Sequence, residues 1–180
     1  MLVALITGAT GQIGKAIAKQ IALTGKYSIV LGCRNEARAK QTVSELISIT
    51  KNEQITYKIV DTSSHSSIQN LAKNWQGPLH LLINDAAQSP PNRELTSDGI
   101  EKQFATNVLG YFWMMQEFSP YLISTAQSIS QSTRIVNVAS YWVGDLDLDD
   151  LQFTKRKYDN NSSYRQSKAC DRILTVAFSN

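Results

Sequence analysis

The sequence contains little of what marks several large classes of protein. Its 180 residues include only two cysteines, Cys33 and Cys170, which lie far apart and form neither a metal-ligand nor a redox pattern. We therefore expect no metal site, and two inert thiols in a reducing cytoplasm.

The sequence also has a small net charge and no long apolar run. The net charge of +3 is small and no basic run accompanies it, so we expect no nucleic-acid partner. The N-terminal apolar run, residues 2–6, is too short to span a membrane and follows no basic leader. With no repeat or linker and an apolar fraction of 42%, the chain predicts one globular domain over residues 1–180 without a transmembrane segment.

Short apolar runs alternate with segments of helical periodicity along the whole chain. Such alternation predicts an α/β fold, a doubly wound parallel sheet of the Rossmann-like kind. A polar, irregular stretch at 144–161 interrupts the pattern, and we expect it to form a solvated flap over an active site. The expected strands are 2–7, 27–33, 55–60, 79–83 and 135–138, and the expected helices are 15–22, 36–50, one beginning near 64, 96–122 and 169–178.

A glycine-rich turn joins the first strand to the first helix. Strand, glycine turn and helix in this order are the context that a dinucleotide fingerprint requires. Glycines let the backbone approach a pyrophosphate, and the helix N-terminus offers N–H groups and a positive dipole end. The predicted cofactor contacts in this turn are Gly8, Thr10, Gly11, Gln12, Ile13 and Gly14.

The residue after the second strand distinguishes between cofactors. An acid there would hold the ribose 2′-hydroxyl of NAD, but this chain has Arg34, which suits a 2′-phosphate. Arg38 stands one helical turn further on, whereas Glu36 argues for a ribose. The predicted cofactor is NADP(H), with NAD(H) as the alternative. Asp61 follows the third strand and either contacts the adenine or caps the next helix.

Polar residues also follow the later strands. Asn84 ends the fourth strand, and the small Ala86 and Ala87 would let the chain pass close to a cofactor. Asn107 stands among apolar residues of a helical stretch and needs hydrogen-bond partners. Ser140 comes at the carboxyl end of the fifth strand.

Tyr164 and Lys168 stand four residues apart in a segment that is expected to be helical. On a helix they would share one face. At ~5 Å and an effective dielectric of ~20, the lysine charge would lower the phenol pKa by about two units, to near ~8. That value suits a general acid/base.

Taken in order, these motifs resemble the short-chain dehydrogenase/reductase family over essentially the whole chain. Four local strings are similar to its retinol-dehydrogenase and protochlorophyllide-reductase-like branch, namely 32–35, 106–112, 134–140 and 163–168. The resemblance implies strand order 3-2-1-4-5, with the usual later strands absent from this chain. It rests on Thr7-Gly8, Asp61, Asn84-Asp85-Ala86-Ala87, Asn107, Ser140 and Tyr164-x-x-x-Lys168.

The resemblance also implies roles for single residues. Tyr164 would be the general acid/base, and Lys168 would lower its pKa and hold the nicotinamide ribose. Ser140 would bond the reacting oxygen, and Asn107 would hold a water on a proton path. The reaction would be hydride transfer between NADP(H) and a carbonyl/alcohol pair, with a hydrophobic substrate implied by the branch. Family members often dimerise through the helices that carry Asn107 and Tyr164.

Three departures from the family pattern keep other functions open. Gly11 comes one residue early, as in relatives that modify nucleotide sugars, so an epimerase or dehydratase is one alternative. Asp85 adds a charge near the expected cofactor. The chain stops at Asn180, where family members continue with further strands, and so it looks C-terminally incomplete. A cofactor-binding redox sensor or interaction module without turnover is the other alternative.

Overall fold

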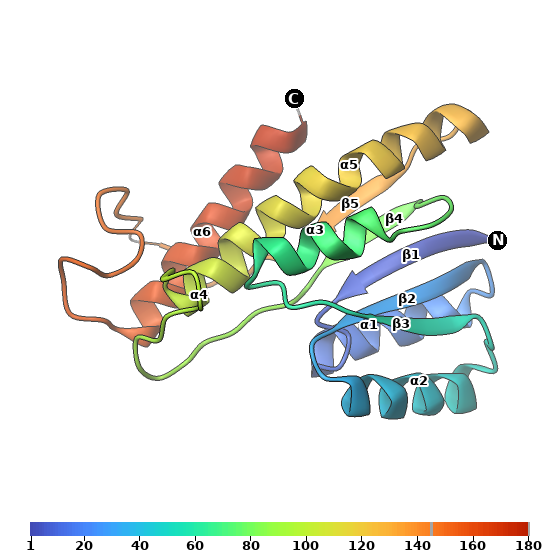
Figure 1. Ribbon diagram of the computed structural model, residues 1–180, viewed down its shortest axis with the longest axis horizontal. Coiled ribbons are helices and arrows are strands. Elements are labelled where there is room, and N and C mark those ends of the chain that lie inside the picture. Colours follow the sequence, from blue (N-terminus) through green and yellow to red (C-terminus); the bar gives the residue numbers. More distant parts are fainter. Residues whose placement is uncertain (145, 180) are drawn as a thin grey trace.

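Parallel strands form the centre of the structure, a computed structural model that describes residues 1–144 and 146–179 (Figure 1). Their order in the sheet is β3-β2-β1-β4-β5, and all neighbouring pairs are parallel. The predicted fold class and strand order are confirmed. The strands are β1 (Leu2–Thr7), β2 (Tyr27–Cys33), β3 (Ile55–Ile59), β4 (Leu81–Asn84) and β5 (Arg134–Asn137).

Helices cover both faces of the sheet. Helices α1 and α2 lie on one face and α3 and α5 on the other, with α6 beside α5 (Figure 1). None of the described helices has the length and apolar content that crossing a membrane requires. The helices are α1 (Gln12–Leu23), α2 (Glu36–Thr50), α3 (His65–Lys73), α4 (Lys102–Phe104), the π-helical turn η1 (Ala105–Leu109), α5 (Gly110–Ile129) and α6 (Asn160–Ser179).

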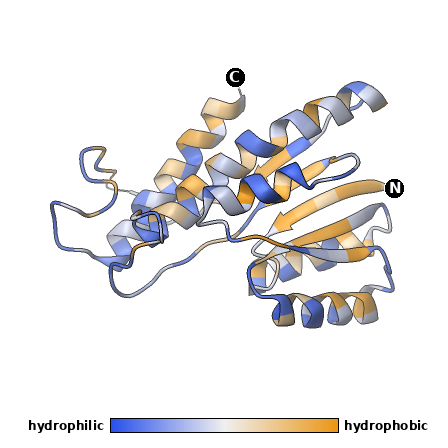
Figure 2. Cartoon of the chain, in the orientation of Figure 1, coloured by the Kyte–Doolittle hydropathy of each residue, from blue (hydrophilic) through white to orange (hydrophobic). Residues whose placement is uncertain are grey.

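The central strand β1 separates two apolar cores. Leu5 and Ile6 are both fully buried, but successive side chains of a strand point to opposite faces. Leu5 therefore packs with α3 and α5 residues such as Phe118, and Ile6 packs with α1 and α2 residues such as Leu46. Figure 2 shows β1 as a nearly continuous hydrophobic strand, as burial on both faces requires.

The sheet register brings the carboxyl ends of three strands to one edge. Thr7 of β1 stands opposite Gly32 of β2, and Ile6 stands opposite Ile83 of β4. The chain runs from β1 to β2 on one side of the sheet and from β4 to β5 on the other, so a crevice opens at this edge between the loops after β1 and β4. This crevice is where a site is expected.

Some predicted helix boundaries are wrong: the helix expected at 96–122 continues to Ile129, and the one expected at 169–178 already begins at Asn160. The helix expected from residue 96 begins at Lys102, because Thr96 donates a backbone hydrogen bond to Ile100 O (2.8 Å) in a tight turn. The buried carboxylate of Glu101 accepts hydrogen bonds from Gln103 N (2.8 Å) and Phe104 N (2.7 Å) and so caps the helix. Glutamate is not a usual capping residue, which is why its position carried no signal in the sequence.

The described residues between β5 and α6 form neither helix nor strand, which confirms the irregular stretch predicted at 144–161 except for its last two residues, where α6 begins. Asp145 lies outside the described residues. The segment is less solvated than expected. The carboxylate of Asp150 is buried and accepts hydrogen bonds from the backbone N–H groups of Thr154, Lys155 and Arg156. The Asp150 carboxylate thus holds residues 154–156 in a compact loop around itself.

Candidate functional site

In the turn after β1, the backbone of Gly8 lies in close contact with the backbone of the loop after β4. Gly8 has φ of +69°, and a Cβ atom there would lie 2.7 Å from Ala86 N. A Cβ atom on Gly14 would lie 2.6 Å from Gly8 O. Gly11 N donates to Gly8 O (2.9 Å) and closes the turn. Only glycine fits Gly8 and Gly14 without displacing the neighbouring chain.

A cavity of about 500 Å³ opens beside this turn at the crevice edge. Its volume is in the range of small-molecule sites. Helix α1 begins at it with Gly11 as N-cap, no side-chain cap and no acidic residue in its first turn. The N–H groups of Gln12 and Ile13 can therefore receive an anion. The predicted contacts that line the cavity are Gly8, Thr10, Gly11, Gln12, Ile13, Arg34, Asp61, Ala86 and Ala87.

Basic residues form one wall of the cavity. Arg34 is exposed there, and Arg38 donates a hydrogen bond from its guanidinium to Thr10 O (3.2 Å). The competing acid, Glu36, pairs with Lys40 (2.9 Å) and accepts a hydrogen bond from Tyr57 Oη (3.0 Å). The acid is thus held by its own helix and by β3.

The two readings of Asp61 are separated by the structure. Ser64 caps α3 by accepting a hydrogen bond from Ser67 N (3.4 Å), so the prediction of a helix cap at Asp61 is wrong. Asp61 instead accepts hydrogen bonds from Ser63 N (2.9 Å) and Ser63 Oγ (2.7 Å). It lines the cavity, which leaves the adenine contact as its predicted role.

Asn84 is placed differently from its neighbours in the loop after β4. Its side chain is fully buried and donates a hydrogen bond to Asn137 Oδ1 (2.9 Å) at the end of the adjacent strand. Asn84 thus joins β4 to β5 and does not line the cavity. Gly14, another predicted contact that is absent from the lining, packs against Gly8 O in the turn. Ala86 and Ala87 carry the loop along the cavity wall.

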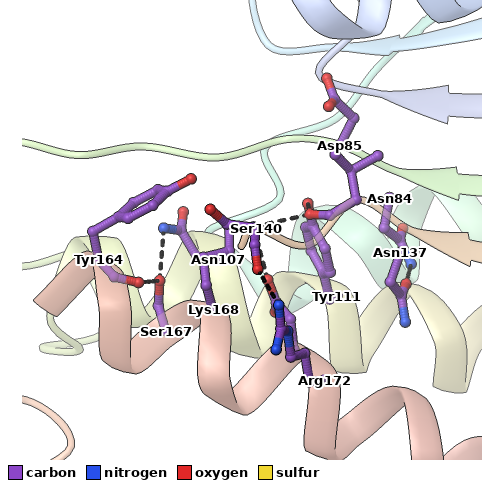
Figure 3. A network of polar contacts seen from close by, with 12 residues as sticks. Asn84, Asp85, Asn107, Tyr111, Asn137, Ser140, Tyr164, Ser167, Lys168 and Arg172 are labelled. Carbon is purple, nitrogen blue, oxygen red and sulfur yellow. Dashed lines mark hydrogen bonds and ion pairs between the residues drawn. The ribbon is translucent and has the colours of Figure 1, made fainter. Parts of the chain in front are cut away.

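Asn107 lies in the π-helical turn η1, a helical irregularity that is frequent at functional sites. Its Oδ1 accepts a hydrogen bond from Gln88 N (2.8 Å), and its Nδ2 donates to Gln88 O (3.0 Å) and to Ser167 Oγ (3.1 Å). The buried amide thus finds the partners that the sequence required. It ties the loop after β4 to α6 (Figure 3).

Lys168 is buried in an ion pair that the motif did not predict. The side chains of Lys168 and Asp171 are 3% and 0% exposed, and Nζ lies 2.7 Å from Asp171 Oδ2. Nζ also donates to Val138 O (3.1 Å) and lies 4.9 Å from the centre of the Tyr111 ring. Asp171 follows Lys168 by three residues, which puts it on the same helix face, so the spacing could have revealed it.

Two buried ionisable groups beside Lys168, the Asp171 carboxyl and the Tyr111 phenol, have raised pKa values. Burial raises the pKa of Asp171 to about 6, against the charge and the hydrogen bond of Lys168. Asp171 Oδ1 is buried without a hydrogen-bond partner among the described residues. Burial also raises the pKa of the Tyr111 phenol well above its usual value. The ammonium group therefore sits in a poorly hydrated environment where each charge has a strong effect.

Ser140 lies three residues beyond the end of β5. Its Oγ accepts a hydrogen bond from Trp142 N (3.0 Å), and its carbonyl accepts one from Arg172 (2.7 Å) on α6. The Trp142 ring centroid lies 6.1 Å from that of Tyr164. Figure 3 shows Tyr164 and Lys168 projecting from α6 toward the side of the molecule that carries Ser140 and Asn107. None of these four residues lines the cavity itself.

Comparisons with known proteins agree with this architecture. The sequence profile described as short chain dehydrogenase matches residues 2–146. Human polyprenol dehydrogenase is 34% identical over 92% of this chain and 51% of its own length. Human dehydrogenase/reductase SDR family member 12 is 35% identical over 95% of this chain and 53% of its own.

A solved structure shows the same fold. The alcohol dehydrogenase of Thermococcus sibiricus, complexed with 5-hydroxy-NADP, superposes with a TM-score of 0.74 at 25% identity. The match covers 99% of this chain and 70% of that one. The present chain spans about half the length of the two curated relatives named above.

Proposed function

This chain belongs to the short-chain dehydrogenase family, and from that premise we propose that it transfers hydride between NADP(H) and a carbonyl/alcohol pair. One observation carries the proposal. Lys168 of α6 donates a hydrogen bond to Val138 O, directly beyond the carboxyl end of β5, and acts electrostatically on Asp85, which lines the cavity of the glycine turn. Tyr164 stands one turn before Lys168 on the same helix. General acid/base groups and an anion-binding helix N-terminus are thus contributed to the same edge.

The residues at the cavity fit a dinucleotide phosphate. The glycine turn leaves no room for a Cβ atom at Gly8 or Gly14, and the N–H groups of Gln12 and Ile13 at the start of α1 are available to an anion. Arg34 supports NADP(H) over NAD(H), because a guanidinium suits a 2′-phosphate. Glu36, the acid that could instead hold a ribose, is paired with Lys40 and Tyr57 and does not line the cavity.

Residues of α6 and of the segments packed against it would each have a separate role in the reaction. The cofactor, when bound, supplies or accepts the hydride. The Tyr164 hydroxyl donates its proton to the substrate oxygen or takes it back, and Ser140 Oγ hydrogen-bonds that oxygen. Asn107 fixes α6 against the loop at residue 88. Lys168 would hold the nicotinamide ribose, and Asp171 offsets part of its charge.

A hydrophobic substrate is the finer part of the proposal. Tyr141 and Trp142 are 94% and 47% exposed, and Trp142 lies beside the ring of Tyr164. Aromatic side chains in this position favour apolar ligands. The retinol-dehydrogenase-like branch and a cytoplasmic location stay predictions.

The test replaces Tyr164 by phenylalanine in the full-length protein. Tyr164→Phe keeps the ring and removes the proton donor, so kcat should fall by on the order of 10²–10⁴ with NADPH affinity nearly unchanged. NADPH oxidation would be followed with aldehydes, ketones and nucleotide sugars. Conversion of nucleotide sugars without net NADPH oxidation would support an epimerase or dehydratase, and NADPH binding without any turnover would support a sensor. Near-full activity of Tyr164→Phe would refute the assignment.

A further inference from the structure

Asp85 places a carboxylate at the beginning of α1. Its backbone N–H is held by Thr7 Oγ1 (3.1 Å) at the end of β1. Its carboxylate accepts a hydrogen bond from Gly14 N and packs so closely on Gly14 that a Cβ atom there would lie 2.7 Å from Oδ2. Figure 3 shows the side chain projecting away from α6 toward the N-terminal part of the chain.

This carboxylate shares its surroundings with the proposed phosphate site. Asp85 lines the same cavity as Gly11, Gln12 and Ile13. An anion at the start of a helix is stabilised by its N–H groups and dipole, and here a side chain of the protein already takes one of those groups. A bound diphosphate would bring further negative charge to the same helix end. The two anions would repel each other through a partly desolvated region.

We propose that Asp85 takes up a proton when a dinucleotide binds, so that this residue makes diphosphate affinity depend on pH. The inference rests on the proposed cofactor site. Burial already raises the pKa of the free carboxyl to about 6, against the charge of Lys168 and the Gly14 hydrogen bond. A nearby diphosphate raises it further. Affinity is therefore highest below about pH 6 and falls as the pH rises through the pKa of the complex.

Other ionisable groups face the same region and must be separated from Asp85. Lys168 and Asp171 on α6 and Tyr111 on α5 are electrostatically coupled to it or to each other. Burial raises the pKa of the Tyr111 phenol well above its usual value, so the phenol does not titrate near pH 6 to 8. Asp171 does, because its pKa is also about 6. It provides the matched control.

The experiment measures ADP-ribose binding by calorimetry, because the diphosphate of ADP-ribose keeps a constant charge where the 2′-phosphate of NADPH would titrate. The full-length wild type should bind about tenfold more weakly at about pH 8 than at about pH 5.5. Asp85→Asn should lose that dependence and bind more tightly than the wild type at about pH 8. Asp171→Asn should keep the dependence. Carbon-13 NMR of the wild-type Asp85 carboxyl should show its pKa rising when ADP-ribose is added.

The outcomes distinguish this inference from the function on which it rests. Binding with no pH dependence, or an Asp85 pKa that ADP-ribose does not change, would overturn the inference and leave the cofactor site standing. The same pH dependence in Asp85→Asn as in the wild type would also overturn it. Absence of ADP-ribose and NADPH binding at every pH would overturn both.

Discussion

Arg34 and Lys168 carry the positive charges on which the proposed chemistry depends, and their environments differ. Arg34 is exposed at the cavity wall, so water screens its charge until a ligand covers it. Lys168 is almost completely buried and needs its partner Asp171. The first side chain should matter for ligand choice and the second for stability as well as for catalysis.

Replacing Arg34 by alanine should change cofactor selectivity. Arg34→Ala should weaken NADPH binding by about 1.5–3 kcal/mol, the range for a hydrogen bond to a charged group, and leave NADH binding nearly unchanged. Fluorescence titration of both cofactors measures this. Arg134→Ala, an exposed arginine on β5, is the control. Equal losses for the two cofactors would mean that Arg34 does not contact the 2′-phosphate.

Breaking the buried ion pair should destabilise the fold in a pH-dependent way. Lys168→Met should lower the free energy of unfolding by about 3–5 kcal/mol at about pH 8, because it leaves Asp171 charged and unpaired. The pKa of Asp171 is already raised to about 6 and rises further without the lysine. At about pH 5 the lone carboxyl is protonated, so the loss is smaller there.

A double-mutant cycle with Asp171→Asn completes this test. Denaturant unfolding of both single variants and the double variant should give a loss for the double variant that is smaller than the sum of the single losses. Additive losses would show that the two side chains do not stabilise each other.

At the scale of elements, helix α6 holds the irregular segment before it through one side chain. The buried amide of Gln166 accepts hydrogen bonds from Asp147 N (2.9 Å) and Arg156 (2.9 Å) and donates to Leu151 O (3.1 Å). One residue thus joins three points of a segment without regular secondary structure. Such segments open locally when their few anchors are removed.

Gln166→Ala should therefore loosen this segment without unfolding the sheet. We expect faster tryptic cleavage at residues 155–157, by about tenfold for a local loss of roughly 1.4 kcal/mol. Circular dichroism should remain that of the wild type. Gln116→Ala, an exposed position on α5, is the control. Unchanged cleavage at 155–157 would show that other contacts hold the segment.

For the whole molecule, the second half of α6 exposes apolar side chains. Ile173 and Val176 are 56% and 61% exposed, and Phe178 is 40% exposed although it packs edge-on against Phe112 of α5. Apolar side chains gathered on one helix favour contact with another surface. This supports the proposal of a homodimer through the helices that carry Asn107 and Tyr164.

A charge on that face should prevent association. Val176→Glu should convert a dimer to a monomer in analytical ultracentrifugation of the full-length protein, because the carboxylate would be desolvated at the interface. Ile49→Glu, which changes a side chain on α2 that is 53% exposed, should leave the dimer intact. A monomeric wild type, or a Val176→Glu variant that still dimerises, would contradict the proposal.

The sequence alone determined the alternation of strands and helices, the glycine turn and the order of the polar residues that follow the strands. These features are local. Strand and helix periods appear in the apolar pattern, and a backbone contact that excludes a Cβ atom requires glycine wherever it occurs. That is why Leu2–Thr7, Tyr27–Cys33 and Glu36–Thr50 have the predicted bounds.

Only the tertiary structure decided which partner each polar side chain meets. The Tyr164–Lys168 spacing predicted an ammonium that acts on a phenol, but packing of α6 on α5 and β5 buries Lys168 against Asp171, Val138 and Tyr111. The same holds for Asn107, whose partners come from residues 88 and 167. The spacing on α6 places Asp171 beside Lys168, but the burial that removes water from this pair, and so makes it decisive, comes from contacts between elements that no local pattern encodes.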